Sequence, residues 1–386
     1  MCPLVWNCGG RETVPDHDVL IVGAGPVGLL LACLLVQEGR HVAVCERRTD
    51  ADERTRAIGI HRPGLEALDT AGIGDAVRAE ALRLDGGEVR SRRRTLATLT
   101  FGQDHPILIL PQPRTGALLR ARLQSLSPES LLLGHDVRGV RQTADAVQIA
   151  CASLDGPHEL SASVVVVADG VRSRLRDRID AGWRRRLGRA SYAMIDLADA
   201  TPDARAVLHC EPEGLVESFP LPGGQRRWVV REAEGGGLRS IEEFCATIET
   251  RTGIAVAPAA DAMPTSFVAA QHAAKRLQRG RLVLLGDAAH EISPIGGQGM
   301  NLGWMDAVRL ATALVRTLPS RTPDLSGYER HARRSASRAQ RRSAFYMSMG
   351  APAPRTVVRG REMLMQGLGS APLRGWTTGL LTMRGL

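Results

Sequence analysis

The amino-acid sequence predicts an α/β fold with a parallel sheet in one domain and a mostly antiparallel sheet in a second. Residues 18–46 pass from an apolar strand-like run through an apolar helix into another strand, which is the pattern of a βαβ unit. Ser163–Ala168 and Arg281–Leu285 are apolar runs of strand length that would extend the same buried sheet. Residues 178–268 instead break into short strand-like runs between Pro and Gly turns, which favours a separate antiparallel sheet.

The βαβ unit comprises three segments. Asp18–Gly23 predicts a buried strand, Pro26–Glu38 a buried helix and His41–Glu46 a second strand. Parallel strands need a crossover connection, and the helix between the two runs supplies it.

The remaining segments extend this pattern. Residues 63–80 have helical spacing with a glycine break, whereas Arg83–Gly102 has the alternation of polar strands and would leave the first sheet. Ser240 suits a helix N-cap with Glu243 three residues later, which predicts a helix over Ser240–Thr252. Further predictions are helices at Arg114–Leu126 and Met300–Leu318, antiparallel strands within Leu131–Leu154 and a helical tail from Tyr328.

The charge pattern argues against a nucleic-acid-binding protein. The net charge is +9, but 41 acidic residues lie among the 50 basic ones, and no long tract of one sign occurs. Aromatic residues make up 3% of the chain, too few for a surface that stacks bases. Because Lys275 is the single lysine, an enzyme that forms a Schiff base would have to use it.

The cysteines and the N-terminal residues favour a cytoplasmic protein. Seven cysteines occur without the paired spacing of a zinc site, so we expect neither a disulfide framework nor a metal site. Residues 1–16 lack the basic start and the apolar stretch of a signal peptide. No apolar run reaches the roughly 18 residues of a membrane span, so we expect no integral membrane association.

Gly23, Gly25 and Gly28 form a G-x-G-x-x-G motif between the first strand and its helix. The first glycine permits the tight turn, the second lets the backbone approach a pyrophosphate, and the third permits close packing of the helix on the strand. The helix N-terminus would bind the phosphates, and Glu46 at the end of the second strand would bind ribose hydroxyls. The motif predicts a Rossmann-like dinucleotide site and leaves FAD and NAD open.

A second segment, Gly286–Asn301, distinguishes these two cofactors. It reads GDAAHEISPIGGQGMN. It resembles the flavin-ribityl motif of the aromatic-hydroxylase family of flavoprotein monooxygenases, the para-hydroxybenzoate hydroxylase type (group A), whose members have G-D-A-A-H, a proline and then G-x-G-x-N. The length of the chain resembles the short form among members that tailor polyketides and other natural products. The resemblance implies a Rossmann-like FAD-binding domain with a parallel sheet and an antiparallel-sheet substrate domain.

The resemblance implies roles for residues of this segment. Asp287 follows a buried strand and would accept hydrogen bonds from the ribityl hydroxyls. The glycines would leave room for the flavin ring, and the helix that begins near Met300 would direct its N-terminus at the N1–C2=O edge of the flavin. We expect His290 to be a packing or hydrogen-bonding residue rather than a catalytic base. The cofactor-binding residues expected here are Gly286, Asp287, Pro294, Gly297, Gly299, Met300 and Asn301.

A third segment, Asp169–Arg176, resembles the D-G-x-x-S-x-x-R motif of the family. The resemblance implies that it contacts FAD and the nicotinamide donor, with Asp169 as the cofactor-binding candidate. Ser173 suits a helix N-cap, and Arg176 would anchor backbone or phosphate.

Weaker resemblances add three further cofactor-binding candidates. Arg47 would lie on the adenine side of FAD and Arg56 near its pyrophosphate. Gln112 would reach the flavin, although Gly116 replaces the glutamate that is usual in this segment. Arg114 is the alternative anchor at this place.

The activity that the resemblance implies is that of an FAD-dependent monooxygenase. NADPH or NADH would act as a transient electron donor, since no second G-x-G-x-x-G motif is present. The enzyme would insert one oxygen atom from O₂ into a hydrophobic aromatic or polyketide-like molecule through a flavin C4a-hydroperoxide. The alternative is a relative that uses FAD for a non-oxygenating reaction, either a double-bond reduction or a cyclisation or rearrangement in natural-product biosynthesis.

The antiparallel sheet would form the roof over the flavin ring and bind the substrate. Leu215, Phe219, Trp228 and Val230 are the candidates for the pocket wall. No histidine, tyrosine or acidic residue of this region stands out as a catalytic base.

The domain organisation expected from these assignments is discontinuous. The FAD-binding domain would comprise residues 17–82, 103–177 and 269–350, the substrate-binding domain residues 83–102 and 178–268, and a C-terminal helical tail residues 351–386.

Overall fold

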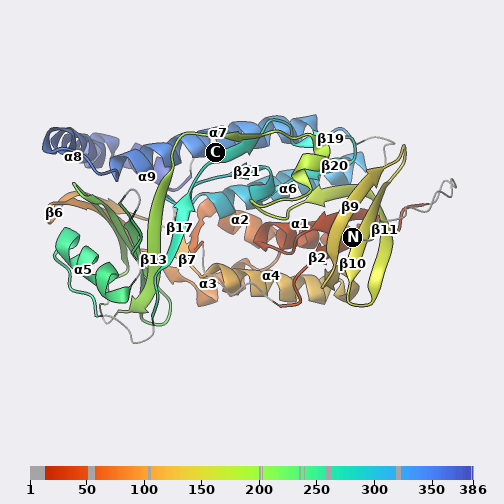
Figure 1. The fold of residues 1–386 in the computed structure, drawn as a ribbon, viewed down its shortest axis with the longest axis horizontal. Coiled ribbons are helices and arrows are strands. Elements are labelled where there is room, and N and C mark those ends of the chain that lie inside the picture. Colours follow the sequence, from red (N-terminus) through yellow and green to blue (C-terminus); the bar gives the residue numbers. More distant parts are fainter. Residues whose placement is uncertain are drawn as a thin grey trace.

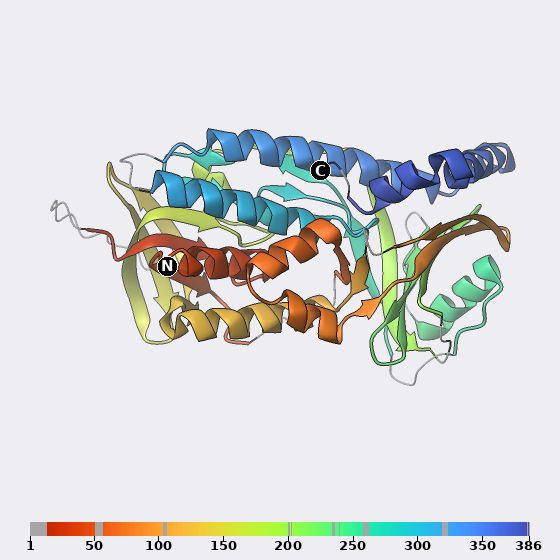
Figure 2. The same ribbon diagram turned by 180° about the vertical axis from the view of Figure 1, so that it is seen from behind.

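The computed structural model describes most of the chain, and the statements below refer to the residues it describes. These are residues 14–50, 57–102, 106–199, 201, 203–233, 236–238, 240–257, 262–318, 323–383 and 385. Two large sheets lie toward opposite ends of an elongated molecule, and the C-terminal helices run along one side of both (Figures 1 and 2).

The first sheet has eight strands and contains the predicted βαβ unit. Five strands run parallel in the order β20-β11-β1-β2-β8, and the antiparallel strands β19, β10 and β9 complete the sheet. Its strands are β1 (His17–Val22), β2 (Val42–Glu46), β8 (Leu131–Leu133), β9 (Asp136–Gln142), β10 (Val147–Ser153), β11 (Gly156–Val167), β19 (Gln278–Arg279) and β20 (Leu282–Leu284).

The prediction for Leu131–Leu154 is right in part. Strands β9 and β10 pair antiparallel as expected, whereas β8 pairs parallel with β2. The reason is that a helix and a short 3-10 turn precede β8, so the chain returns to the sheet edge by a crossover and enters in the parallel direction.

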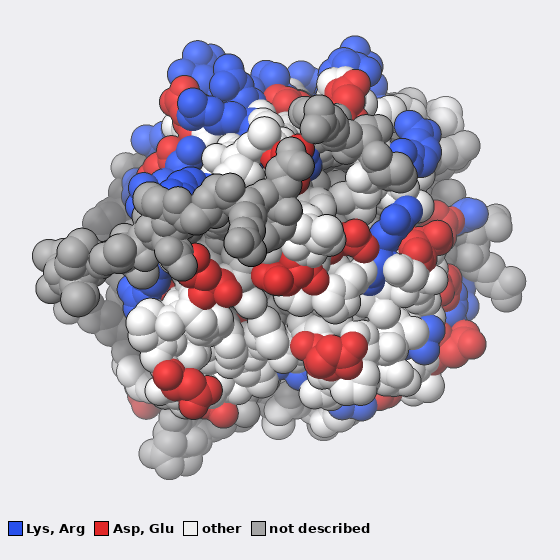
Figure 3. Space-filling view, turned by 90° about the vertical axis from the view of Figure 1, so that its right-hand side faces the viewer, with Lys and Arg blue, Asp and Glu red and all other residues white. Residues whose placement is uncertain are grey.

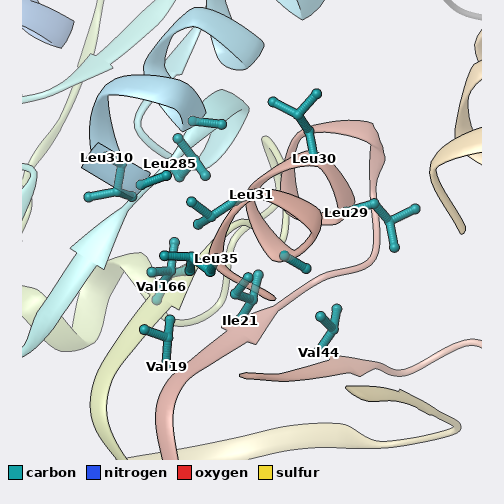
Figure 4. Close-up of a cluster of buried hydrophobic side chains, with 14 of the residues drawn as sticks. Val19, Ile21, Leu29, Leu30, Leu31, Leu35, Val44, Val166, Leu285 and Leu310 are labelled. Carbon is teal, nitrogen blue, oxygen red and sulfur yellow. The ribbon is translucent and has the colours of Figure 1, made fainter. Parts of the chain in front are cut away.

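Helix α1 (Pro26–Gln37) fills the centre of the larger core. It lies between the parallel sheet and two helices, α4 (Gln112–Leu126) and α6 (Gly299–Thr317). Apolar residues therefore occur on all of its sides, and Leu29, Leu31 and the neighbouring leucines pack against strand and helix residues alike (Figure 4).

The second sheet has seven strands and is mostly antiparallel, as predicted. Its order is β17-β13-β16-β15-β14-β5-β6, and only β14 and β5 pair parallel. The excursion predicted for Arg83–Gly102 supplies the hairpin of β5 and β6. The strands are β5 (Gly86–Ser91), β6 (Arg94–Thr100), β13 (Ala190–Ala198), β14 (Arg205–Glu211), β15 (Gly214–Leu221), β16 (Gln225–Arg231) and β17 (Thr265–Ala269).

Helix α5 (Ile241–Thr252) covers one face of the second sheet (Figure 1). The predicted N-cap is confirmed, because the Ser240 hydroxyl accepts a hydrogen bond from the Glu243 amide at 3.2 Å. Residues of the other face line the cavity described below and pack with Met347 of α7 and Met365 of α8.

The remaining elements connect and cover the two sheets. The helices are α2 (Arg62–Thr70), α3 (Gly74–Glu80), α7 (Ser326–Met349), α8 (Arg355–Gly369) and α9 (Ala371–Leu381), with 3-10 turns η1 (Pro128–Ser130), η2 (Arg176–Ile179) and η3 (Gly286–Ala288). Two three-stranded sheets contain β3 (Gly59–His61), β4 (Leu82–Arg83) and β7 (Ile107–Ile109), and β12 (Trp183–Arg185), β18 (His272–Ala274) and β21 (His290–Glu291). The residue boundaries of the predicted domains stay a prediction.

On the end face in Figure 3, basic side chains gather along one edge and acidic side chains are spread over the rest. Among the described residues, no helix is both long enough and apolar enough to cross a bilayer.

Candidate active site

A cavity of about 1710 Å³ lies between the two large sheets. One wall is formed where the parallel strands of the first sheet end at their carboxyl termini, which is where open α/β sheets bind ligands. The opposite wall is the inner face of the seven-stranded sheet. Since ligand sites are about 300–1,000 Å³, this cavity has room for more than one small molecule.

The three glycines of the G-x-G-x-x-G motif occupy the turn between β1 and α1, and each meets a different demand. Gly23 has a φ of +108°, and a Cβ there would lie 2.5 Å from the Ala168 carbonyl oxygen. A Cβ on Gly28 would lie 2.2 Å from the Gly23 carbonyl oxygen. A Cβ on Gly25 would meet no protein atom within 4 Å, and this residue lines the cavity. The first and third glycines are therefore required by packing, and the second keeps the cavity open.

Glu46 ends β2 beside this turn, as predicted. Its carboxylate accepts a hydrogen bond from the Ala24 amide at 3.0 Å and a second from the Arg48 amide at 3.1 Å. Glu46 and Arg47 both line the cavity. Arg56, the third candidate on this side, lies outside the described residues.

Asp169 follows β11 and lines the cavity with its carboxyl group buried. One oxygen accepts a hydrogen bond from the Arg174 amide at 3.2 Å, whereas no described residue hydrogen-bonds to Oδ1. Burial raises the pKa of Asp169 above its usual value, although hydrogen bonds from Ser173 and the Arg174 main chain oppose this rise. A buried oxygen without a partner at a cavity wall is suited to a ligand hydroxyl or amide.

Arg176 is an anchor for the main chain. Its guanidinium donates to the carbonyl oxygens of Val171 at 3.0 Å and Ala288 at 3.3 Å, and it stacks 3.7 Å above the Trp183 ring. The Ser173 hydroxyl accepts a hydrogen bond from the Arg176 amide at 3.0 Å, as expected of a cap. Arg176 thereby ties the Asp169 segment to the Gly286 segment.

The Gly286–Asn301 segment crosses the cavity wall between β20 and α6. Gly286, Asp287, Pro294, Gly297, Gly299 and Met300 all line the cavity. Gly296 and Gly297 have φ values of +94° and +64°, conformations that suit glycine. Helix α6 begins at Gly299, so its N-terminus with free amide groups points at the cavity wall.

Asn301 is placed differently from its neighbours in this segment. It is fully buried behind the loop, outside the cavity lining. Its Nδ2 donates to the carbonyl oxygens of Gly59 at 2.9 Å and Gly297 at 3.0 Å, and its Oδ1 accepts from the His61 amide at 2.9 Å. The side chain of Asn301 therefore holds the loop against β3, and its contact with the cofactor stays a prediction.

His61 is a cavity residue that sequence reasoning missed. It lies at the end of β3, lines the cavity beside Gly297, and has a buried Nδ1 without a partner among the described residues. Burial lowers the pKa of His61 to about 4, so the ring is neutral near pH 7. Nothing in the local sequence distinguishes this histidine from the nine others.

His290 is buried outside the cavity lining, which fits the expectation of a hydrogen-bonding residue. Its Nε2 lies 2.7 Å from Asp306 Oδ2 on α6, and Arg309 contacts the other Asp306 oxygen at 3.3 Å. Burial lowers the pKa of His290, but the hydrogen bond and the charge of Asp306 outweigh this, so the pKa is raised overall. The pair fixes the Gly286 segment to α6.

Gln112 lines the cavity at the start of α4, and its Oε1 accepts from the Ala57 amide at 3.3 Å. Arg114, the alternative anchor, lies outside the cavity lining and forms a surface ion pair with Glu80 at 2.7 Å. Gln112 and Arg114 are two residues apart on α4. Because each residue turns the helix by about 100°, their side chains lie on opposite sides of it, and Arg114 points away from the cavity.

The wall formed by the seven-stranded sheet includes two of the four pocket candidates, and the role of each in substrate binding stays a prediction. Leu215 and Phe219 on β15 line the cavity. Trp228 and Val230 on β16 face the other way and pack with Phe244 of α5. The reason is the alternation of side chains along a strand, which puts Val229 and Arg227 of β16 on the cavity face instead.

The comparisons with known proteins give the family. The sequence profile of the family described as "FAD binding domain" matches residues 16–343. A 12-dehydrotetracycline 5-monooxygenase/anhydrotetracycline 6-monooxygenase from Streptomyces rimosus is 31% identical over 360 residues, which are 88% of this chain and 71% of that protein. The chain belongs to the group A flavoprotein monooxygenases.

Other relatives of this FAD-dependent monooxygenase agree. Ubiquinone hydroxylase from Rhodospirillum rubrum is 32% identical and is matched over 77% of this chain and 72% of its own length. The structure of OxyS anhydrotetracycline hydroxylase from Streptomyces rimosus has a TM-score of 0.79 and 28% identity, and the match covers 96% of this chain and 76% of that one. The structure of p-nitrophenol 4-monooxygenase from Pseudomonas putida has a TM-score of 0.85 and 23% identity over 96% and 98% of the two chains, which shows the shared fold.

The cavity of the monooxygenase fits FAD. Two helices, α1 and α6, direct their N-termini at it, one suited to a pyrophosphate and the other to the electron-rich edge of a reduced flavin. The open space at Gly25 and the unpaired oxygen of Asp169 lie on this same wall. The individual contacts between these residues and FAD stay predictions.

Proposed function

We propose that this flavoprotein hydroxylates a hydrophobic, polycyclic aromatic molecule of the polyketide type, with NADPH or NADH as the electron donor. The observation that carries the proposal is that one cavity joins the FAD wall to the inner face of the seven-stranded sheet. Bound FAD supplies the electron transfer from the nicotinamide and the activation of O₂. The tetracycline monooxygenase among the relatives supports the substrate class.

The residues of the first wall would bind and orient FAD. Gly25 and the α1 N-terminus would hold the pyrophosphate, and Glu46 would accept hydrogen bonds from the ribose. Asp287 would accept hydrogen bonds from the ribityl chain, and the amides at the start of α6, near Gly299, would stabilise negative charge on the reduced flavin.

The residues of the second wall would bind the aromatic rings and exclude water. Leu215, Phe219 and Val229 of the sheet line this part of the cavity, together with Met365 of α8 and Trp376 of α9. Apolar side chains from these elements would limit the access of water to the reacting atoms, which a monooxygenase needs to avoid wasteful release of hydrogen peroxide.

A reducing compartment such as the cytoplasm suits the protein. The five cysteines of the described residues are free and buried, and all of them lie within strands or helices. Thiols in such positions act as small apolar side chains.

The test uses the purified protein with FAD. We expect a yellow flavin spectrum, and we expect anhydrotetracycline or another polycyclic phenol to stimulate the consumption of NADPH and O₂ with formation of a product that is 16 mass units heavier, about the mass of one oxygen atom. Turnover of a substrate without O₂ uptake would favour the non-oxygenating alternative. A colourless protein that FAD cannot reconstitute would overturn the assignment altogether.

A further inference from the structure

Glu217 is a carboxylic acid on the apolar wall of the substrate side. It lies on β15 between Leu215 and Phe219 in the alternating pattern, and all three side chains line the cavity. Only 3% of the residue is exposed. A carboxyl group at such a position costs free energy unless a partner satisfies it.

Other buried acids of the same sheet have partners in the protein. Glu88 on β5 accepts hydrogen bonds from Arg90 at 2.8 Å and from Arg205 at 2.5 Å. Glu211 on β14 accepts from the Arg92 amide at 2.7 Å through one oxygen, whereas its other oxygen has no partner among the described residues. In contrast, no hydrogen bond joins the Glu217 carboxyl to any described residue. A structural role would need such a bond, so the missing partner is expected to come from the cavity.

The surroundings of Glu217 connect it to the flavin wall. Its neighbours across the strands are Leu208 and Val229, both of which line the cavity. Leu215 and Val229 belong to the same apolar cluster as Ile295, which precedes Gly296 in the segment expected to hold the flavin ring. Glu217 therefore faces the part of the cavity where the aromatic rings of a substrate would meet the flavin.

The charge state of Glu217 determines which atoms it can bind. Burial raises the pKa of its carboxyl group to about 8, so the group is mostly neutral at pH 7 and offers one donor and one acceptor. Nearby, burial raises the pKa of Cys210 to about 12 and also raises that of Tyr192. Arg227 on the same wall is paired with Asp196 at 2.7 Å. Of these groups, Glu217 is the one that changes charge between pH 7 and pH 9.5.

We propose that Glu217 hydrogen-bonds an oxygen substituent of the substrate, a ring ketone or a phenolic hydroxyl, and thereby selects the orientation in which the rings meet the flavin. This inference rests on the proposed function, because it assumes that the cavity binds an aromatic substrate. It assigns a polar recognition group to a wall that is otherwise apolar.

The experiment compares a tricyclic ketone with the matching hydrocarbon. Binding of 9-fluorenone and of fluorene to the FAD-loaded protein is measured through the change in flavin absorbance at pH 7 and pH 9.5, and neither probe ionises in this range. We expect about tenfold tighter binding of the ketone at pH 7, from the one extra hydrogen bond. Most of this preference should disappear at pH 9.5, where an ionised carboxylate has no proton to donate.

Three variants make the result decisive. Glu217→Leu should bind both probes equally at either pH, whereas Glu217→Gln, which always has a proton to donate, should prefer the ketone at both. The control Glu211→Gln changes a buried acid of the same sheet that lies outside the cavity lining, and it should behave like the natural enzyme.

The inference is overturned if Glu217→Leu still prefers the ketone, if Glu217→Gln loses the preference at pH 9.5 as the natural enzyme does, or if the natural enzyme binds neither probe. The binding assay needs no turnover, so it can succeed when O₂ uptake fails. Conversely, if the enzyme consumes O₂ during turnover but binds 9-fluorenone and fluorene equally, the role of Glu217 is wrong and the monooxygenase function stands.

Discussion

The two walls of the cavity are built by different means. The FAD wall depends on main-chain geometry: glycines that allow close approach, helix N-termini, and acids that follow the ends of parallel strands. The substrate wall depends on side chains that alternate along the strands of one sheet, such as Leu215, Glu217 and Phe219. The comparison teaches that a substitution on the first wall acts through backbone clashes and lost cofactor, and a substitution on the second through shape and polarity.

The largest effect should come from the glycine turn of the FAD wall. Gly28→Ala places a Cβ 2.2 Å from the Gly23 carbonyl oxygen, so the turn must deform, and we expect both the stability and the flavin content to fall severely. Gly25→Val meets no protein atom near the Cβ position, so it should leave the apoprotein as stable as before and still reduce FAD affinity by about 100-fold.

Urea denaturation of the apoprotein and the ratio of flavin to protein absorbance measure these two quantities. Equal destabilisation by both substitutions would contradict the distinct roles of the two glycines.

The next largest effect tests the two faces of the second sheet. Trp228 is buried against α5, so Trp228→Ala should lower the free energy of unfolding by about 3–5 kcal/mol. Phe219 borders the cavity, so Phe219→Ala should cost less stability, about 1–2 kcal/mol, and should change substrate affinity instead. Denaturation curves and KM values separate the two outcomes. A change in KM from Trp228→Ala that exceeds the change from Phe219→Ala would reverse the assignment of faces.

A pH-dependent effect is expected behind the FAD wall, where His290 contacts Asp306. The raised pKa of folded His290 means that this pair stabilises the protein fully below the unfolded value of 6.5 and loses its effect as the pH rises through the folded pKa. Asp306→Asn should therefore cost about 3 kcal/mol at pH 6 and clearly less at pH 9.

Thermal or urea unfolding of both proteins across this pH range measures the difference. A difference in unfolding free energy that stays constant with pH would show that the charge of His290 does not contribute to the stability of the folded protein.

The smallest of these effects concerns one hydrogen-bonding side chain of the FAD wall. Asp287→Ala should weaken FAD retention by about tenfold, because a carboxylate that accepts ribityl hydrogen bonds would be lost. Asp75→Ala on the surface helix α3 is the matched control and should retain FAD normally. Unchanged FAD affinity after Asp287→Ala would count against the ribityl role and leave the wall to act through its main chain alone.

The sequence predicted the residues of the FAD wall more completely than those of the substrate wall. A turn that needs a positive φ favours glycine, so Gly23 could be identified from the spacing of its motif, and Gly286 and Gly297 from the resemblance to the family. Asn301 belongs to the same motif as the glycines, but its side chain is buried behind the loop, because a motif does not reveal which of its members face the cavity.

For the second wall, the sequence showed that side chains alternate between the two faces of each strand, but it did not show which of them face the cavity. Trp228 and Val230 were assigned to the cavity, and Val229 between them lines it instead. Both faces of this sheet are apolar, one against α5 and the other toward the cavity, so composition could not tell them apart. Glu217 was not predicted as a cavity residue, because a single acidic residue in a strand usually faces solvent.

The sequence by itself determined the βαβ unit, the glycine turns and the order of the cofactor segments, because each depends on local backbone geometry that only certain residues can adopt. Only the tertiary structure decided which strand faces the cavity, how β8 enters the sheet and which buried acid has no partner. These properties depend on contacts between segments far apart in the chain, such as Leu215 of β15 with the cluster of Ile295, and β2 with β8. The segments of the cofactor wall could therefore be located from local sequence, whereas the side chains that line the substrate pocket depend on how distant segments pack.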